Sequence, residues 1–492
     1  MTVSSILLAA IILSSQVDPN RTAWNPAETI ITSANVPTIH PVGFFATDGP
    51  IYAQPLIAPV MIRSTMYNAL FTCTMNDTCY AFDADSPGVL LWRTPLGIIP
   101  RTSYPASSDE YGVPLGCLST PSIDPVTQRM FAICSSSSSW VLFCIDLVTG
   151  AIRKQTTIAG AYGGAMFDPG FHNFRSGVTL ANGNVYIMAA CLCNEQSDTW
   201  HGWAFAYDEN LNPVGVFCTT PTGNGGGIWS SGAAASVDSS GNLYVSTGNG
   251  SWDGISNFSE SVLKLSPTLT LLDWFTPSDW ASLMANDEDL ASNRAILIPG
   301  TSLLVHTAKD FRVFLLSQSD LGHLQGTGTA PVQVFTMGGT VGSGTGAYGS
   351  AWMNETYYIP STIGGLSAFS FNGSTFNPTT SASINFGVGF PGPAGLFGSG
   401  TTILWAVTPN GDASTMEQTG MLHALNPSTL AELWNSGSTL GHLPKFAAPV
   451  VANGKVYVST LDNQVQVYGL PPGSGAGRIS ISSVGIGSVA RR

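Results

Sequence analysis

The sequence predicts an all-β fold: an eight-bladed β-propeller of four-stranded antiparallel blades, with the ring closed by an N-terminal strand. Three observations predict this class. A strand-turn-strand pattern recurs eight times, 54 of the 492 residues are glycine, and only 10% of the residues are charged. Glycine favours tight turns, whereas exposed helix faces are usually built from Glu, Lys and Arg. A chain with many turns and few charges is therefore expected to consist of short strands.

The repeat unit is clearest near the C-terminus. Residues 451–460 contain a strand with the turn Asn453-Gly454, and residues 464–469 alternate with period two, as in a hairpin. The large apolar position of this unit, Tyr457, recurs at intervals of 46 to 60 residues, at Phe71, Phe131, Tyr186, Tyr244, Leu304, Tyr358 and Leu404. Further strands follow in each unit, so each repeat has the content of one propeller blade.

The last repeat ends near Leu470, after its third strand. We expect residues 42–46 to supply the fourth strand, because this closure removes the open sheet edges of the ring. The propeller is therefore expected to span residues 40–470, with a lead-in over 17–39. A flexible tail rich in Gly and Ser is expected over 471–492.

The apolar run at residues 6–13 is too short to span a membrane, but its length fits the core of a secretory signal. We expect residues 1–16 to be a signal peptide and the chain to be secreted or extracellular. A buried or frayed N-terminal segment is the alternative. Glycosylation of an exported chain is compatible with sequons at Asn20, Asn76, Asn249, Asn257, Asn354 and Asn372.

Eight cysteines lie between Cys73 and Cys218. An even number in one region favours disulfides, although buried free thiols are the alternative. The candidates are Cys73 and Cys79 across one turn, Cys134 and Cys144 across a serine-rich turn, and Cys193, which ends a strand one strand pair before Cys218. No Cys-x-x-Cys pair is present, so neither structural zinc nor covalent haem is expected.

The formal net charge is −13, from 17 basic and 30 acidic residues. Proteins that bind nucleic acid need clustered Lys and Arg, and this sequence has no such cluster. Nucleic-acid binding is therefore excluded. No Gly-x-Ser-x-Gly motif lies in a strand-to-helix context, which leaves hydrolase chemistry without support.

Several motifs resemble those of the secreted repeat propellers related to the quinoprotein alcohol dehydrogenases, which use pyrroloquinoline quinone (PQQ). They are Ala81-Phe82-Asp83 leading to Trp92, Ala424-Leu425-Asn426 leading to Trp434, residues 226–232 with 241–250, His172-Asn173-Phe174-Arg175, and His201-Gly202-Trp203. The resemblance implies a propeller over residues 40–470. In the enzymes of this superfamily it also implies PQQ, a calcium ion and adjacent cysteines that form a disulfide over the cofactor.

This sequence departs from that pattern because no two cysteines are adjacent, the closest being Cys191 and Cys193. The calcium ligands and the catalytic carboxylate are not assigned to residues by the resemblance. We therefore expect a monomeric scaffold, without dehydrogenase activity, that binds a small molecule, a glycan or a protein. The alternative is a PQQ- and calcium-dependent dehydrogenase that oxidises alcohols or sugars.

Loops between blades, and between the second and third strands of a blade, lie on one face of such a ring, here called the top face. Binding residues are commonly placed on loops of this kind. The candidate ligand-binding residues there are His172, Arg175, His201, Trp203, Trp229, Arg294, Lys309 and Lys445. Arg and Lys would recognise a carboxylate, a phosphate or an anionic quinone, and the aromatic rings would stack on a sugar or planar ring. Pairing of the basic residues with nearby carboxylates, and packing of the aromatic residues within blades, are the alternatives.

Oxygen ligands for calcium are offered by Asn249, Asp253 and Asn257, which lie in one loop of this face. Their spacing does not match an EF-hand loop. The sequence therefore predicts a possible calcium site here without fixing its geometry.

Overall fold

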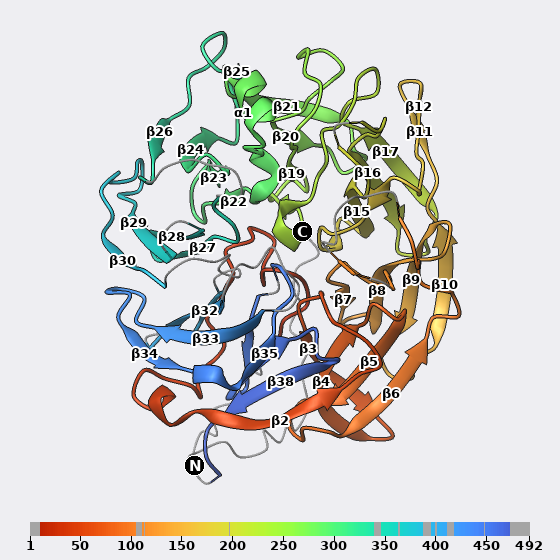
Figure 1. The fold of residues 1–492 in the computed structure, drawn as a ribbon, viewed down its shortest axis with the longest axis vertical. Coiled ribbons are helices and arrows are strands. Elements are labelled where there is room, and N and C mark those ends of the chain that lie inside the picture. Colours follow the sequence, from red (N-terminus) through yellow and green to blue (C-terminus); the bar gives the residue numbers. More distant parts are fainter. Residues whose placement is uncertain are drawn as a thin grey trace.

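The structure is a computed structural model that describes residues 10–104, 111–112, 114–195, 197–338, 346–362, 365–386, 395–398, 401–410, 418–446 and 448–472. Antiparallel sheets surround a central axis, and they form the eight blades of a propeller (Figure 1). The predicted fold class is therefore confirmed.

The first four blades follow each other in chain order, each with its strands arranged from the ring centre outward. Blade 1 contains β3 (Leu56–Ile62), β4 (Thr65–Cys73), β5 (Thr78–Asp83) and β6 (Leu90–Pro95). Blade 2 contains β7 (Ser122–Asp124), β8 (Arg129–Ser135), β9 (Trp140–Asp146) and β10 (Ile152–Thr157). Blade 3 contains β13 (His172–Asn173), β14 (Thr179–Ala181), β15 (Asn184–Cys191), β16 (Trp203–Asp208) and β17 (Pro213–Cys218). Blade 4 contains β18 (Ser236–Val237), β19 (Leu243–Ser246), β20 (Val262–Leu265) and β21 (Leu271–Thr276), which β25 (His323–Leu324) extends.

The next three blades continue the ring. Blade 5 contains β22 (Ile296–Leu297), β23 (Leu303–Thr307), β24 (Arg312–Ser317) and β26 (Gln333–Thr336). Blade 6 contains β27 (Ala351–Met353), β28 (Thr356–Ser361), β29 (Gly365–Ser370) and β30 (Ala382–Ile384). Blade 7 contains β31 (Gly395–Phe397), β32 (Ile403–Pro409), β33 (Thr419–Leu425) and β34 (Glu432–Asn435), with β1 (Trp24–Asn25) and β35 (Leu440–His442) at its margins.

Blade 8 closes the ring with a strand from the other end of the chain. It contains β36 (Val450–Ala452), β37 (Lys455–Ser459) and β38 (Gln464–Gly469), and β2 (His40–Ala46) pairs with β38. The expected closing strand, residues 42–46, lies within β2. Phe45, opposite Val465 in this pairing, is fully buried.

The repeated large apolar residue occupies the same place in every blade. Tyr457 and its seven counterparts all lie in the second strand, and none is more than 2% exposed. Adjacent blades are also joined by polar contacts: the Trp92 indole of β6 donates a hydrogen bond of 2.8 Å to the Leu147 carbonyl of blade 2. The repeat therefore specifies both the core of each blade and contacts between blades.

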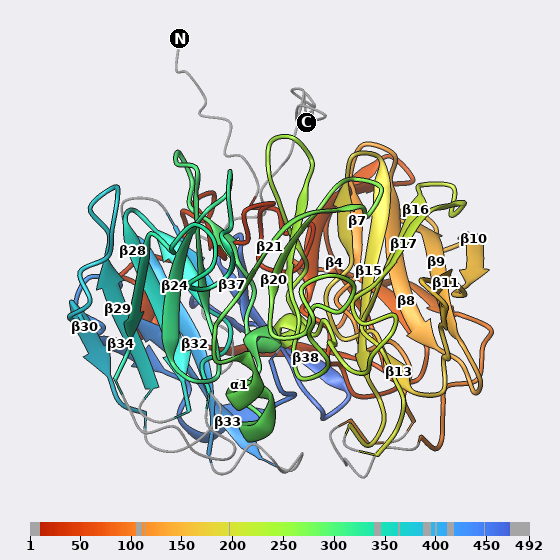
Figure 2. The same cartoon turned by 90° about the horizontal axis from the view of Figure 1, so that it is seen from above.

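Helices are short. One α-helix, α1 (Trp280–Asn286), connects blades 4 and 5 and lies at the lower edge of the ring in Figure 2, which is the top face defined above. Single 3-10 turns occur at Val36–Thr38, Ser230–Gly232, Leu290–Ser292 and Gly437–Thr439, and a small hairpin joins β11 (Ala161–Tyr162) to β12 (Ala165–Met166). Among the described residues, no helix has the length and apolar character needed to cross a membrane.

The disulfides agree with the sequence prediction only in part. Cys73 and Cys79 face each other across β4 and β5 and are bonded. The other two candidate pairings are wrong. Cys134 is bonded to Cys117 and Cys193 to Cys191, whereas Cys144 and Cys218 are buried free thiols. Strand register is the reason, because Cys134 faces Val141, Cys144 faces Phe131, and Cys218 faces Trp203.

The N-terminal segment is packed inside the ring from Ala10 onward. Ala10 and Ile12 are 1% and 0% exposed, respectively. Residues 10–16 thus fit the alternative of a buried segment. The expected signal peptide over 1–16 and tail over 471–492 stay predictions, since residues 1–9 and 473–492 lie outside the described residues.

Candidate functional site

Two carboxylates of one connection converge on a lysine at the top face. Lys309 lies in the turn between β23 and β24, and Asp287 and Asp289 directly follow α1. The Lys309 ammonium lies 2.9 Å from Asp287 Oδ1 and 2.5 Å from Asp289 Oδ2. The lysine side chain is only 12% exposed. Burial alone would lower its pKa, but Asp289 and Asp287 raise it above the usual range, so the ammonium is retained.

Asn249, from the loop between β19 and β20, joins these carboxylates. Its backbone N–H donates to Asp289 Oδ1 at 2.9 Å, and its side-chain amide donates to Asp287 Oδ1 at 2.8 Å. The preceding residue must be small, because a Cβ at Gly248 would lie 2.2 Å from Asp289 Oδ1. Glycine therefore permits the close approach of the Asn249 loop to Asp289.

Two further carboxylates belong to this group. Glu260 precedes β20 and is completely buried. Its Oε2 accepts a hydrogen bond of 2.8 Å from the Leu290 N–H, while its Oε1 has no partner among the described residues. The Asn249 Oδ1 atom is likewise buried and unpartnered within that part of the chain. Glu195, in the loop after β15, is close enough to interact with Asn249 and Asp289. Glu195, Asn249, Glu260, Asp287, Asp289 and Lys309 are called the acidic cluster below.

The acidic cluster has more negative groups than its one ammonium can balance. Burial, followed by the charge of Asp289, raises the pKa of Glu260 well above its usual range. The same two causes raise the pKa of Glu195 to about 7, although this residue has exposed surface. Asp287 is shifted upward as well, against the opposing effect of Lys309. A group of four carboxyl side chains around one lysine is therefore suited to share a proton or to bind a cation.

An aromatic group adjoins the acidic cluster. The Lys309 ammonium lies 5.6 Å from the centre of a Trp229 ring. Trp229 is half-buried and follows a glycine-rich run between blades 3 and 4. Its ring lies 5.8 Å from that of Phe446 and 6.2 Å from that of Tyr348. These three side chains are called the aromatic group below.

Arg175 lies on the other side of Phe446. Its guanidinium carbon is 4.3 Å from the Phe446 ring centre and 5.0 Å from that of Tyr111. It donates to the Tyr111 hydroxyl at 3.0 Å and to the Lys445 carbonyl at 3.2 Å. The structure thus connects four candidates from the sequence, Arg175, Trp229, Lys309 and Lys445, along one side of the channel mouth.

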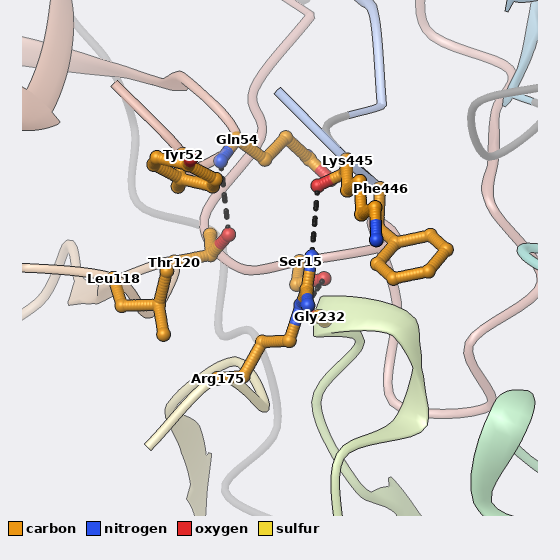
Figure 3. A pocket seen from close by; sticks show the side chains of 9 residues that line it. All are labelled: Ser15, Tyr52, Gln54, Leu118, Thr120, Arg175, Gly232, Lys445 and Phe446. Carbon is orange, nitrogen blue, oxygen red and sulfur yellow. Dashed lines mark hydrogen bonds between the residues drawn. The ribbon is translucent and has the colours of Figure 1, made fainter. Parts of the chain in front are cut away.

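The channel beside Arg175 has little free space. Figure 3 shows Arg175, Lys445 and Phe446 around a cavity of about 10 Å³, with Ser15 and Gly232 on its wall. That volume holds about one water molecule. A shallow hollow of about 340 Å³ lies elsewhere, beside Arg101, Tyr104, Ser137, Ser138 and Gly170. No residue of the acidic cluster lines either of these two cavities.

Of the remaining ligand-binding candidates, His172, Trp203 and Arg294 are buried and His201 is half-buried. His172 is 1% exposed, contacts the carbonyls of Asp168 and His201, and has its pKa lowered to about 4 by burial. His201 contacts the Thr220 carbonyl at 2.9 Å. Trp203 is fully buried in blade 3, and Arg294 is 2% exposed and bonded to backbone carbonyls. For these four residues the structure favours packing roles.

The three calcium candidates do not converge. Asn249 joins the acidic cluster, but the Asp253 carboxylate accepts hydrogen bonds from the backbone N–H groups of Ile255, Ser256 and Asn257. Burial raises the pKa of Asp253, but these hydrogen bonds together outweigh it and hold the pKa below its usual range. Asn257 donates to Asp253 and Thr222. The oxygen-bearing side chains of one loop suggested this site, whereas the converging carboxylates come from distant connections that no local motif identifies.

Neither a protein-family model nor a curated protein matches the sequence. Solved structures do match. A quinohemoprotein alcohol dehydrogenase, ADHIIG of Pseudomonas putida HK5, is 13% identical, with a TM-score of 0.64 over 94% of this chain and 80% of that one. A europium-containing methanol dehydrogenase is also 13% identical, with a TM-score of 0.64 over 94% and 98%. The chain has the fold of the quinoprotein dehydrogenases.

A solved structure that is not named as a dehydrogenase has the same fold. BamB of Moraxella catarrhalis is 13% identical, with a TM-score of 0.53 over 88% of this chain and all of that one. At these identities the likeness to quinoprotein dehydrogenases establishes the fold alone. Function must be inferred from the acidic cluster and the aromatic group.

Proposed function

We propose that this chain binds PQQ together with a hard cation at the channel mouth and acts as a quinoprotein dehydrogenase on alcohols or sugars. The observation that carries the proposal is the convergence of four carboxyl side chains around Lys309, beside Trp229. The sequence alone favoured a scaffold, because no two cysteines are adjacent and the calcium ligands and catalytic carboxylate could not be assigned to residues.

The donor set fits such a cation. Calcium and related hard ions prefer carboxylate and amide oxygens, and all candidate ligands here are of this type. The unpartnered Oε1 of Glu260 and Oδ1 of Asn249 are buried oxygens whose desolvation a cation would compensate. Asn249, Glu260 and Asp289 would hold the ion, which would be calcium or, as in the europium-containing relative of this fold, a lanthanide.

The aromatic group fits a planar anionic ring. Trp229 offers a half-buried indole, and Lys309 and Arg175 place positive charge on either side of the aromatic group. Stacking would hold the ring, and the cations would attract its carboxylates. When bound, PQQ would supply the oxidising power for removal of two electrons from an alcohol.

The chain itself would handle the proton of the alcohol. A general base is most effective when its pKa is near the working pH. A carboxylate oxygen of Glu195, with its pKa raised to about 7, can accept a proton at neutral pH. Lys309 holds Asp287 and Asp289 in position and limits the repulsion among the carboxylates.

Equilibrium dialysis tests this proposal directly. Protein stripped with a chelator is mixed with PQQ, with and without CaCl2 or LaCl3, and dye-linked oxidation of alcohols and sugars is followed. We expect about one PQQ per chain only when the cation is present, and at least a tenfold loss of affinity in Trp229→Leu, which corresponds to about 1.4 kcal/mol.

Trp252→Leu is the matched control, because Trp252 is also half-buried but packs against Trp274 and Trp280. This variant should bind PQQ as the parent does. Equal loss in the two variants, or no PQQ binding at millimolar concentrations, would contradict the proposal.

A partner-binding scaffold is the second candidate, and the absence of adjacent cysteines favours it. In that case the same mouth would bind a glycan or protein without PQQ, and a glycan array or pull-down with purified extracellular proteins would give saturable binding that Trp229→Leu removes.

For either function we propose an extracellular location. Non-reducing mass spectrometry should find three disulfides, and eight free thiols would count against export.

A further inference from the structure

Residues 10–28 make one turn around the inside of the ring, and they are called the inner strap below. At its start, the Ala10 N–H donates to Asn453 Oδ1 of blade 8 at 3.0 Å. At its end, the Gly454 N–H of blade 8 donates to Glu28 Oε2 at 3.1 Å. Both ends therefore meet the same turn of blade 8. Figure 1 shows the red N-terminal trace near the ring centre, beside β22 and β27.

Between these ends the inner strap contacts the blades in order. Ile12 and Ile57 of blade 1 exchange two backbone hydrogen bonds, of 2.8 and 2.9 Å. The innermost strands of the other blades donate to strap carbonyls: Ile123 of blade 2 to Leu13, Val237 of blade 4 to Pro19, Leu297 of blade 5 to Asn20, Trp352 of blade 6 to Thr22 and Leu396 of blade 7 to Ala23, at 2.8 to 3.2 Å. Beside blade 3, a Cβ at Gly177 would lie 2.9 Å from the Ser15 Cβ, so strap and blade are in close contact there.

Side chains fix the strap as well. Arg21 is 2% exposed, and its guanidinium donates to the carbonyls of Ala235 and Ser15 at 2.8 and 3.0 Å. The Arg21 carbonyl in turn accepts two hydrogen bonds from Arg294. Arg294, a ligand candidate from the sequence, thus has a positioning role toward the strap.

The strap backbone is strained, which shows how strongly the ring constrains it. Gln16, Val17, Arg21 and Ala23 have φ values of 59° to 74°. This region is unfavourable for residues other than glycine, and most of all for a β-branched residue such as Val17. Such conformations persist where the surrounding contacts over-determine them.

We propose that the inner edges of the blades form a circular peptide-binding groove, and that its occupant is the chain's own inner strap. Recognition is by main-chain hydrogen bonds to strand edges, the same chemistry by which a sheet binds an added strand. The strap links all eight blades and so locks the closed ring. This inference is independent of the proposed dehydrogenase function.

The proposal has a consequence for processing of the N-terminus. A cut after residue 16, as the apolar run suggests, would remove the contacts of Ala10, Ile12 and Leu13 to blades 8, 1 and 2. The inner strap must therefore stay in the mature protein, and any signal cleavage of an exported chain must fall before Ala10.

Two neighbouring isoleucines provide a matched test in the full chain. Ile12 is fully buried, whereas Ile11 is 36% exposed. Ile12→Ala should unfold at a clearly lower temperature than the parent, and Ile11→Ala at nearly the parent temperature. Equal effects of the two substitutions would overturn the proposal.

Peptide exchange tests the groove itself. A protease site placed between the exposed residues Ser33 and Ala34 allows the folded protein to be cut after the strap. We expect fragment 1–33 to stay bound in gel filtration and to leave only in denaturant. A synthetic peptide of residues 10–28 should then restore the parental unfolding temperature, and its Ile12→Ala version should bind at least about tenfold more weakly.

Release of fragment 1–33 under native conditions, with the ring still folded at its original unfolding temperature, would overturn the groove. The ring could also unfold once the fragment is removed, without refolding when peptide is added. In that case the unfolding temperatures of Ile11→Ala and Ile12→Ala decide whether the proposal holds. N-terminal sequencing of the mature protein should give a start at or before Ala10, and a start at Val17 would contradict retention of the strap.

Discussion

Two buried cations, Arg294 and Lys309, lie fifteen residues apart and have opposite surroundings. The Arg294 guanidinium donates to the carbonyls of Arg21 and Ser350, and no carboxylate lies within ion-pair distance of it among the described residues. Burial lowers its pKa to about 9. Lys309 contacts two carboxylates, which raise its pKa above the usual range.

The difference shows what separates a structural charge from a candidate site. The Nε and Nη2 atoms of Arg294 donate to backbone oxygens and hold the inner strap, while Nη1 has no partner among the described residues. Around Lys309 the opposite charge is in excess, and buried oxygens of Glu260 and Asn249 lack partners. Burial of a charge is common to both residues, so it does not identify function. The two residues differ in the excess of carboxylates, which makes the surroundings of Lys309 the candidate site.

The largest effect should come from removal of the Lys309 charge. Lys309→Met leaves the carboxylates of the acidic cluster without their ammonium, and breaking such a buried pair costs about 3–5 kcal/mol. Urea unfolding at pH 7 measures this loss. Added CaCl2 or LaCl3 should recover part of it if the cluster binds cations.

Arg153→Met is the control for Lys309→Met, since Arg153 forms an exposed pair with Asp146. Such pairs contribute about 0–1 kcal/mol. A Lys309→Met protein that is as stable as the parent, with no response to cations, would remove the distinction between the two buried charges.

A smaller effect is expected at Arg294. Arg294→Met leaves the carbonyls of Arg21 and Ser350 without a donor, at a cost of about 1–3 kcal/mol. Cations should not recover this loss, because no unbalanced carboxylate lies beside the residue. CaCl2 could instead restore the stability of Arg294→Met as much as that of Lys309→Met. That result would show that the surroundings of Arg294 and Lys309 do not differ in cation binding.

The sequence could predict the fold because the blade repeat is local. Tyr457 and its counterparts recur at regular intervals, and each lies in the second strand of a blade. Closure by residues 42–46 followed from the missing fourth strand of the last repeat. These features depend on period and turn residues, which are readable in one chain.

The site was predictable only in part. Basic residues are few in this sequence and aromatic residues are large, so both kinds stand out. Arg175, Trp229 and Lys309 could therefore be located on the expected face. Glu195 and Asp289 are 94 positions apart and come from different blades, and their convergence depends on the ring geometry. The inner strap was missed for a similar reason: its contacts are mostly backbone hydrogen bonds, which residue types do not encode. Two of the three predicted disulfide pairings were wrong, because the positions of cysteines along the chain do not fix strand register.

The smallest effect concerns a buried carboxyl that lies outside the acidic cluster. Asp77 of blade 1 is 1% exposed, and its Oδ2 has no partner among the described residues. Burial, and secondarily the charge of Asp48, raises its pKa to about 8. In the unfolded chain the carboxyl ionises near pH 4. The folded state therefore binds more protons between these values, and stability falls as the pH rises from about 4 to 8.

Asp77→Asn removes this proton and hence this part of the pH dependence. We expect the variant to gain stability over the parent as the pH rises, by about 1.4 kcal/mol or more at pH 8, which corresponds to at least one pKa unit. Urea unfolding from pH 5 to pH 8 measures the gain.

Asp253→Asn should lose stability relative to the parent as the pH rises, because hydrogen bonds hold the pKa of Asp253 low and the ionised form stabilises its loop. CaCl2 should change neither variant relative to the parent, since both carboxyls lie outside the acidic cluster. A calcium response at Asp77 as large as that at Lys309 would mean that unpartnered carboxyls in general, rather than the arrangement around Lys309, attract the ion.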